Sequence, residues 1–139
     1  MARRQFWRLI EDFARRGTAI LVTTHYLEEA EHCNRMGFMV SGEIVAQGSP
    51  QEIKAAQPGQ LLELVTESPL AASSLLKNHM ESWRVSIFGD RLHVVSDDPN
   101  RDISRIQGWF KDADILLQSL RPIPFTLEDA FIGIVQRSS

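Results

Sequence analysis

A histidine that follows a short apolar run is the clearest candidate for chemistry in this sequence. His25 comes after Ala19–Val22 and two threonines. A short unbroken apolar run is typical of a strand buried on both faces, as in a parallel sheet, so we predict a strand over Ala19–Thr24. Ligands of such sheets bind beyond the carboxyl ends of the strands, where His25 would contact them. The alternative is a polar residue that only ends the strand, and position alone favours this alternative.

Two further patterns concern metals. His25, Glu29 and His32 are spaced i, i+4 and i+7, so one helix face could present all three to a metal ion. No additional ligand has a characteristic spacing, which favours a solvated acidic face, and we expect no metal site. Cys33 is the single cysteine, which excludes an internal disulfide and a cysteine-rich zinc site, and we expect it to be a small core residue.

Phosphate-binding patterns are weak. Gly37 and Gly42 have the spacing of a P-loop, but Glu43-Ile44 follows where lysine and serine or threonine are required. The Arg3–Arg4 pair could contact phosphate, although such arginines more often lie on a solvated helix face. The formal charge is −3 and the pI is about 5.8, so no basic field favours nucleic acid.

Elements of two kinds can position these residues. We expect, in chain order, a helix over Phe6–Phe13, the strand Ala19–Thr24, a helix capped by Thr24, hairpin strands Met36–Val40 and Glu43–Ala46, and a helix from Pro50 to Ala56 after the N-cap Ser49. Pro58-Gly59 breaks this pattern. We therefore place a domain boundary there, which gives domains 1–57 and 60–139.

The second domain has the order β-α-β-β-α-β followed by a helix. We expect strands at Leu61–Thr66, Trp83–Ile87, Leu92–Ser96 and Ile115–Leu120. We expect helices at Pro69–Met80, at Ile103–Phe110 and from the N-cap Thr126 onward. This order is the ferredoxin-like arrangement. RNA binding is disfavoured, because the strands "LLELVT" and "RLHVVS" lack stacking aromatic residues. A small-ligand regulatory module remains open.

The first half of the chain resembles a known family. "ILVTTHYLEEAEHCNRMGFMVSGEIVAQGSP", Ile20 to Pro50, is similar to the end of the ATP-binding subunit of an ABC transporter, in which an apolar strand ends in the switch-loop histidine. "ARRQFWRLIEDFARRGTAIL" is similar to the helix after the D-loop. Residues 60–139 more loosely resemble the C-terminal extension of the ABC-2, drug-exporter-like branch, most clearly in "FTLEDAFIGIV", Phe125 to Val135.

This resemblance implies a fold and a role for His25. The implied fold class is α/β, with the C-terminal remnant of a P-loop ATPase domain followed by a ferredoxin-like α+β domain. His25 would be the switch histidine, which contacts the γ-phosphate of ATP and helps to order the attacking water. The Walker A, signature, Walker B and D-loop motifs would precede Ala2 in a longer exporter ATPase that binds ATP and Mg²⁺. We expect the fragment to bind no cofactor and to be inactive alone.

The resemblance also implies partners and a location. The parent would act as a nucleotide-sandwiched dimer beneath a membrane permease, in the cytoplasm and peripheral to the inner membrane. The longest apolar runs are too short for a transmembrane segment, which needs about 20 residues. For the fragment we expect a homodimer formed through residues 1–57 by strand pairing or segment exchange. The alternative function is a stand-alone ferredoxin-like regulatory or protein-interaction module.

Overall fold

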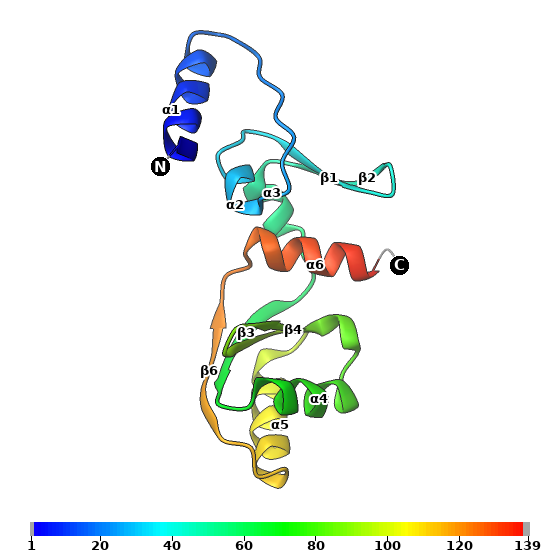
Figure 1. Ribbon diagram of the computed structural model, residues 1–139. Coiled ribbons are helices and arrows are strands. Elements are labelled where there is room, and N and C mark those ends of the chain that lie inside the picture. Colours follow the sequence, from blue (N-terminus) through cyan, green and yellow to red (C-terminus); the bar gives the residue numbers. More distant parts are fainter. Residues whose placement is uncertain (1, 138–139) are drawn as a thin grey trace.

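The computed structural model describes residues 2–137 and contains two antiparallel sheets with six α-helices (Figure 1). The elements of the first part are α1 (Ala2–Arg15), α2 (Leu27–Ala30), β1 (Met36–Val40), β2 (Glu43–Gly48) and α3 (Pro50–Ala55). Those of the second part are β3 (Gln60–Thr66), α4 (Pro69–His79), the 3-10 helix η1 (Ser82–Arg84), β4 (Val85–Phe88), β5 (Arg91–Ser96), α5 (Pro99–Asp112), β6 (Leu117–Ile123) and α6 (Leu127–Arg137). Within residues 2–137, no helix is both long enough and apolar enough to cross a membrane.

The larger sheet confirms the ferredoxin-like arrangement. Its strand order is β4-β5-β3-β6, with all neighbours antiparallel, and the two crossovers contain α4 and α5. Leu62 of β3 pairs with Val94 of β5 on one side and with Pro122 of β6 on the other. Gly59 precedes β3 with φ of 76°, and a Cβ there would lie 2.6 Å from the carbonyl oxygen of Ser96. Glycine at this position therefore lets β3 enter the sheet beside β5.

The main core lies between this sheet and helices α4 and α5. Alternate strand residues point to opposite faces of a sheet, so every second residue of β3 and β5 contributes to this core. The core consists of Leu62, Leu64, Ala72, Leu76, Val85, Leu92, Val94, Ile106 and Phe110, each at most 3% exposed. The sheet and helices α4 and α5 thus enclose one apolar core.

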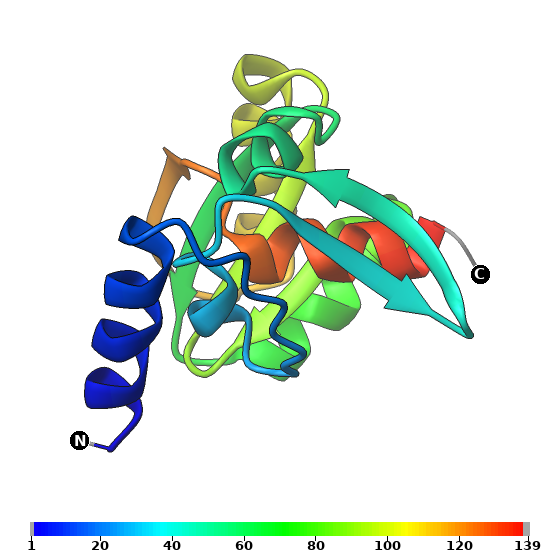
Figure 2. The ribbon, with the colours of Figure 1, turned by 90° about the horizontal axis from the view of Figure 1, so that it is seen from above.

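Helix α6 lies on the opposite face of the sheet, between it and the β1–β2 hairpin (Figure 1). A second core joins α6 to the first part of the chain and consists of Ala30, Phe38, Ile53, Leu127, Ala130 and Ile134. Figure 2, viewed from above, shows α6 crossing beneath the hairpin. The division at residues 57–60 stays a prediction, because α6 contacts elements on both sides of it.

Local sequence determines α3 as expected. The hydroxyl oxygen of Ser49 accepts a hydrogen bond from the Glu52 amide, and the Glu52 carboxylate accepts one from the Ser49 amide, both at 3.0 Å. This reciprocal pair is a capping box, and Pro50 occupies the first helical position. The predicted N-cap is therefore confirmed.

The predicted strand Ala19–Thr24 is wrong. These residues have no regular secondary structure, and the side chain of Leu21 is 96% exposed. An apolar run becomes a buried strand only when neighbouring strands and packing partners cover it, and residues 2–137 provide none there. Helix α1 is present and amphipathic, yet Phe6, Leu9 and Phe13 on its apolar stripe are 44–53% exposed.

Candidate functional site

His25 lies in an exposed bend two residues before α2 begins. Its ring packs against the ring of Tyr26, with centroids 4.2 Å apart and planes at 34°. The guanidinium carbon of Arg3 lies 3.7 Å from the centre of the Tyr26 ring, which is a cation–π contact. The imidazole of His25 is thus supported on one side and accessible to solvent on the other.

Glu29 of α2 fixes the turn that contains His25. Its carboxylate accepts hydrogen bonds from Trp7 Nε1 at 2.7 Å, from Thr24 Oγ1 at 2.9 Å and from Arg3 Nη1 at 2.9 Å. The Thr24 hydroxyl oxygen in turn accepts a bond from the amide of Tyr26 at 3.0 Å. These four bonds connect α1, α2 and the bend at His25, and we call them the Glu29 network.

Charge strengthens the Glu29 network. The hydrogen bond from Trp7 lowers the pKa of the Glu29 carboxyl, and although burial opposes this effect, the Thr24 bond and the charge of Arg3 lower the pKa further. The carboxylate is therefore ionised at neutral pH, and its hydrogen bonds are charge-assisted. This arrangement can hold the backbone on both sides of His25 while its imidazole contacts a ligand.

Removing the Glu29 carboxylate should loosen the bend at His25. We expect Glu29→Ala to increase protease cleavage within residues 17–26 several-fold, because the bend loses its connection to α1. Limited proteolysis with mapping of the cut sites measures this. Glu28→Ala is the matched control, since Glu28 is the neighbouring exposed carboxylate with no ion pair among residues 2–137. Equal cleavage rates for the two variants would contradict a positioning role for Glu29.

Several predicted residues have other neighbours than expected. The N-cap of α2 is Tyr26, so Thr24 does not cap this helix as predicted, and its hydroxyl bonds to Glu29 instead. His32 stacks on Trp7, with centroids 5.2 Å apart, and does not join His25. Across residues 2–137, no group of three His, Cys, Asp or Glu side chains could hold a metal ion. Cys33 is half-buried, and burial raises the pKa of its thiol.

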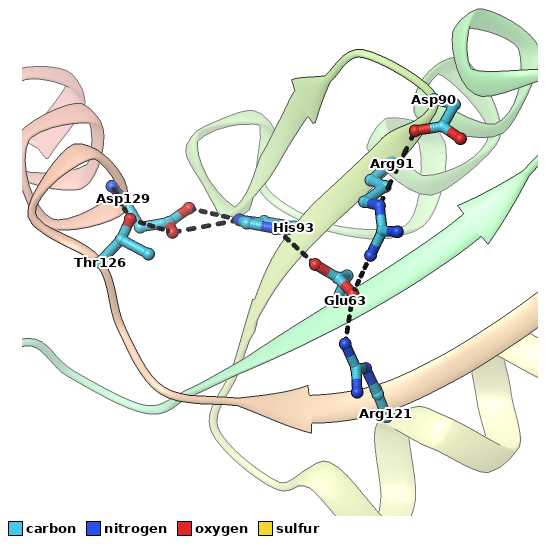
Figure 3. Close-up of polar contacts among 7 residues, drawn as sticks. All are labelled: Glu63, Asp90, Arg91, His93, Arg121, Thr126 and Asp129. Carbon is cyan, nitrogen blue, oxygen red and sulfur yellow. Dashed lines mark hydrogen bonds and ion pairs between the residues drawn. The ribbon is translucent and has the colours of Figure 1, made fainter.

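A buried polar network that the sequence did not indicate lies between the large sheet and α6 (Figure 3). His93 Nδ1 of β5 lies 2.8 Å from Asp129 Oδ1 of α6, and His93 Nε2 lies 3.4 Å from Glu63 Oε2 of β3. Arg91 and Arg121 donate to Glu63 Oε1 at 2.7 and 3.2 Å. The only signal in the sequence is a histidine and a glutamate inside otherwise apolar strands, where buried polar groups require partners.

Asp129 has a second partner at the start of α6. The Thr126 hydroxyl donates to Asp129 Oδ2 at 2.6 Å and accepts from the Asp129 amide at 3.1 Å. The prediction that Thr126 caps the last helix is thereby confirmed. The Asp129 carboxylate therefore takes part both in the N-cap of α6 and in the buried network around His93.

Comparison with known proteins identifies relatives over nearly the whole chain. No family model matches it. It is 32% identical over 138 residues to Nod factor export ATP-binding protein I of Mesorhizobium japonicum, covering 98% of this chain and 38% of that protein. The protein of the same name from Rhizobium sp. strain N33 is 30% identical, with coverage of 98% and 43%.

A third relative matches a shorter stretch of the chain. The probable multidrug ABC transporter ATP-binding protein YbhF of Escherichia coli K12 is 40% identical over 55 residues, which are 40% of this chain and 10% of that protein. The chain spans about two fifths of the length of the Nod factor export relatives. It is therefore related, over nearly its whole length, to the C-terminal part of ABC transporter ATP-binding proteins, which confirms the resemblance seen in its sequence.

Proposed function

We propose that the chain is the C-terminal part of the ATP-hydrolysing subunit of an ABC exporter and that His25 is its switch histidine. The observation that carries this proposal is the relatedness to export ATP-binding proteins along 98% of the chain, including the segment around His25. The exposed position of His25 at the end of the Glu29 network also supports it, because a switch residue needs an accessible imidazole on a positioned backbone.

The proposed chemistry of His25 is hydrogen-bond donation. An imidazole N–H can stabilise negative charge that develops on a phosphoryl oxygen, and it can help to orient the attacking water. Such a donor acts only when its geometry is fixed in advance, which the Glu29 network provides. Mg²⁺ and most contacts to ATP would come from residues outside this chain, because the sequence has no Walker A motif.

Partners and location follow from the same proposal. ABC ATP-binding proteins work beneath a membrane permease, so we infer a permease partner and a position at the cytoplasmic face of the inner membrane. Residues 60–139 would then form an accessory domain with a regulatory role. The contact of α6 with both parts of the chain supports such a role.

The homodimer of the isolated chain stays a prediction, with one correction. Pairing of strand Ala19–Thr24 is no longer a route, because this segment is not a strand. The exposed apolar side chains of Phe6, Leu9 and Phe13 on α1 remain as a stripe through which two copies would associate, and Leu21 is exposed as well.

Titration with Mg-ATP tests the division of labour between this chain and the longer subunit. We expect this chain to show no measurable binding, because one charge-assisted hydrogen bond from His25 provides only about 1.5–3 kcal/mol. Micromolar affinity requires about 8 kcal/mol. The full-length subunit should bind in that range under the same calorimetric conditions. Micromolar binding by residues 1–139 alone would contradict the proposal.

A further inference from the structure

Helix α6 is packed on two sides. On one side, Leu127, Ala130 and Ile134 contribute to the core that contains Ala30 of α2 and Phe38 of β1. On the other side, Asp129 is 6% exposed and contacts His93 of the sheet. These contacts alternate along the first turn of α6, so a shift of this turn displaces both surfaces together.

A short series of contacts leads from His93 to His25. Asp129 lies between Leu127 and Ala130, which pack in one core with Ala30 of α2. The neighbouring residue of α2 is Glu29, which bonds to Thr24 directly before His25. Core packing of α6 on α2, followed by the exposed hydrogen bond between Glu29 and Thr24, therefore connects the sheet to the bend at His25.

The charges around His93 come from three strands and α6. Asp129 of α6 and Glu63 of β3 lie beside the two ring nitrogens. Arg91 of β5 and Arg121 of β6 both pair with Glu63, and among residues 2–137 no arginine pairs with Asp129. From β4, the side chain facing the imidazole is uncharged Phe88, whose ring centroid lies 4.4 Å away.

The protonation state of His93 changes how firmly α6 is held. A protonated imidazole donates from both nitrogens, to Asp129 and to Glu63. A neutral imidazole has one N–H, so one of the two carboxylates faces a lone pair instead of a donor. Asp129 is the partner most sensitive to this change, since Thr126 is its only other side-chain donor among residues 2–137.

We propose that His93 and Asp129 are positioning residues for His25, and that the contact between them sets the placement of α6 and, through α6, of the helix that follows His25. For ATP turnover this inference rests on the proposed function, whereas the structural coupling does not. The coupling would let the accessory domain change the activity of a histidine that it does not contact.

The pKa values of the network support the proposal and give the sign of its pH dependence. Burial by itself lowers the pKa of His93, but the hydrogen bond and charge of Asp129, with those of Glu63, raise it above the usual 6.5. The stabilisation is therefore fully present below pH 6.5 and is lost as pH rises through the raised pKa. Glu63 behaves oppositely: burial raises its pKa, the bonds from Arg121, His93 and Arg91 lower it below the usual 4.5, and its contribution is lost in acid. The stabilising contributions of His93 and Glu63 are therefore both complete between pH 4.5 and pH 6.5.

NMR titration of the 139-residue chain tests the coupling. In the wild type, we expect the amide signals of Leu27 and Ala30 to shift with the same midpoint as the ring protons of His93. His93→Gln and Asp129→Asn should each remove that component, whereas components with other midpoints should persist. His79→Gln is the matched control, because His79 is a histidine of the same domain that stacks on Trp109.

The wild-type titration decides the matter even if a variant does not fold. Absence of a component with the His93 midpoint at Leu27 and Ala30 would overturn the proposal, as would its persistence in folded His93→Gln. In the full-length subunit, His93→Gln should change the alkaline limb of the turnover profile. No ATP is present in the NMR experiment, so coupling without an effect on turnover would reject only the proposed role of His25.

Discussion

Replacing His25 by alanine in the full-length subunit should lower ATP turnover about 100-fold or more. The imidazole is proposed to donate to charge that develops in the transition state, so its loss affects the chemical step and not the ground-state complex. ATP binding should be nearly unchanged for the same reason. Phosphate release measured with the permease present, together with the dissociation constant for Mg-ATP, separates the two effects.

His79→Ala is the control for that experiment. His79 is also exposed, but it stacks on Trp109 of α5 in the sheet domain, with centroids 4.3 Å apart. Its removal should leave turnover unchanged. If His25→Ala retained wild-type turnover, His25 would have no part in the mechanism. If its loss of turnover matched an equal loss of ATP affinity, His25 would be a binding residue only.

Phe38→Ala should destabilise the chain by about 3–5 kcal/mol. Phe38 is 4% exposed, and its ring packs edge-on against Phe131 of α6 with centroids 5.0 Å apart. Truncation leaves a cavity where the hairpin contacts α6. Urea unfolding followed by circular dichroism measures the change in free energy.

Met39→Ala is the matched control, because Met39 is the next residue of β1 and is 65% exposed. Its loss should change the free energy of unfolding by less than about 0.5 kcal/mol. Similar losses for both variants would show that the second core does not hold the hairpin on α6. The proposed coupling between His93 and the bend at His25 runs through that core, so it would be weakened as well.

Local patterns in the sequence predicted most of the regular elements. The hairpin around Ser41-Gly42 and the capping box at Ser49 are determined by residues close in the chain, and both are present. The order of strands and helices beyond residue 60 was sufficient for the ferredoxin-like arrangement, because short connections leave few ways to pair four strands.

Contacts between distant residues explain what the sequence did not predict. Trp7 and Glu29 are 22 residues apart, and His93 and Asp129 are 36 residues apart, so no spacing rule relates them. The error at Ala19–Thr24 has the same origin, because a buried strand requires neighbours that its own residues do not specify. His25 was singled out as a candidate from its position after an apolar run, and its proposed role came from the family resemblance. The Glu29 network beside it could be recognised only from the fold.

A structure of the full-length subunit with its permease, trapped with Mg-ADP and vanadate as a mimic of the transferring phosphoryl group, tests the role of His25 most directly. We expect a ring nitrogen of His25 to lie within hydrogen-bond distance, about 3 Å, of a vanadate oxygen. We also expect Glu29 to remain bonded to Thr24. A trapped complex in which the His25 imidazole points into solvent, and another side chain donates to the vanadate from its direction, would show that His25 is not the switch histidine.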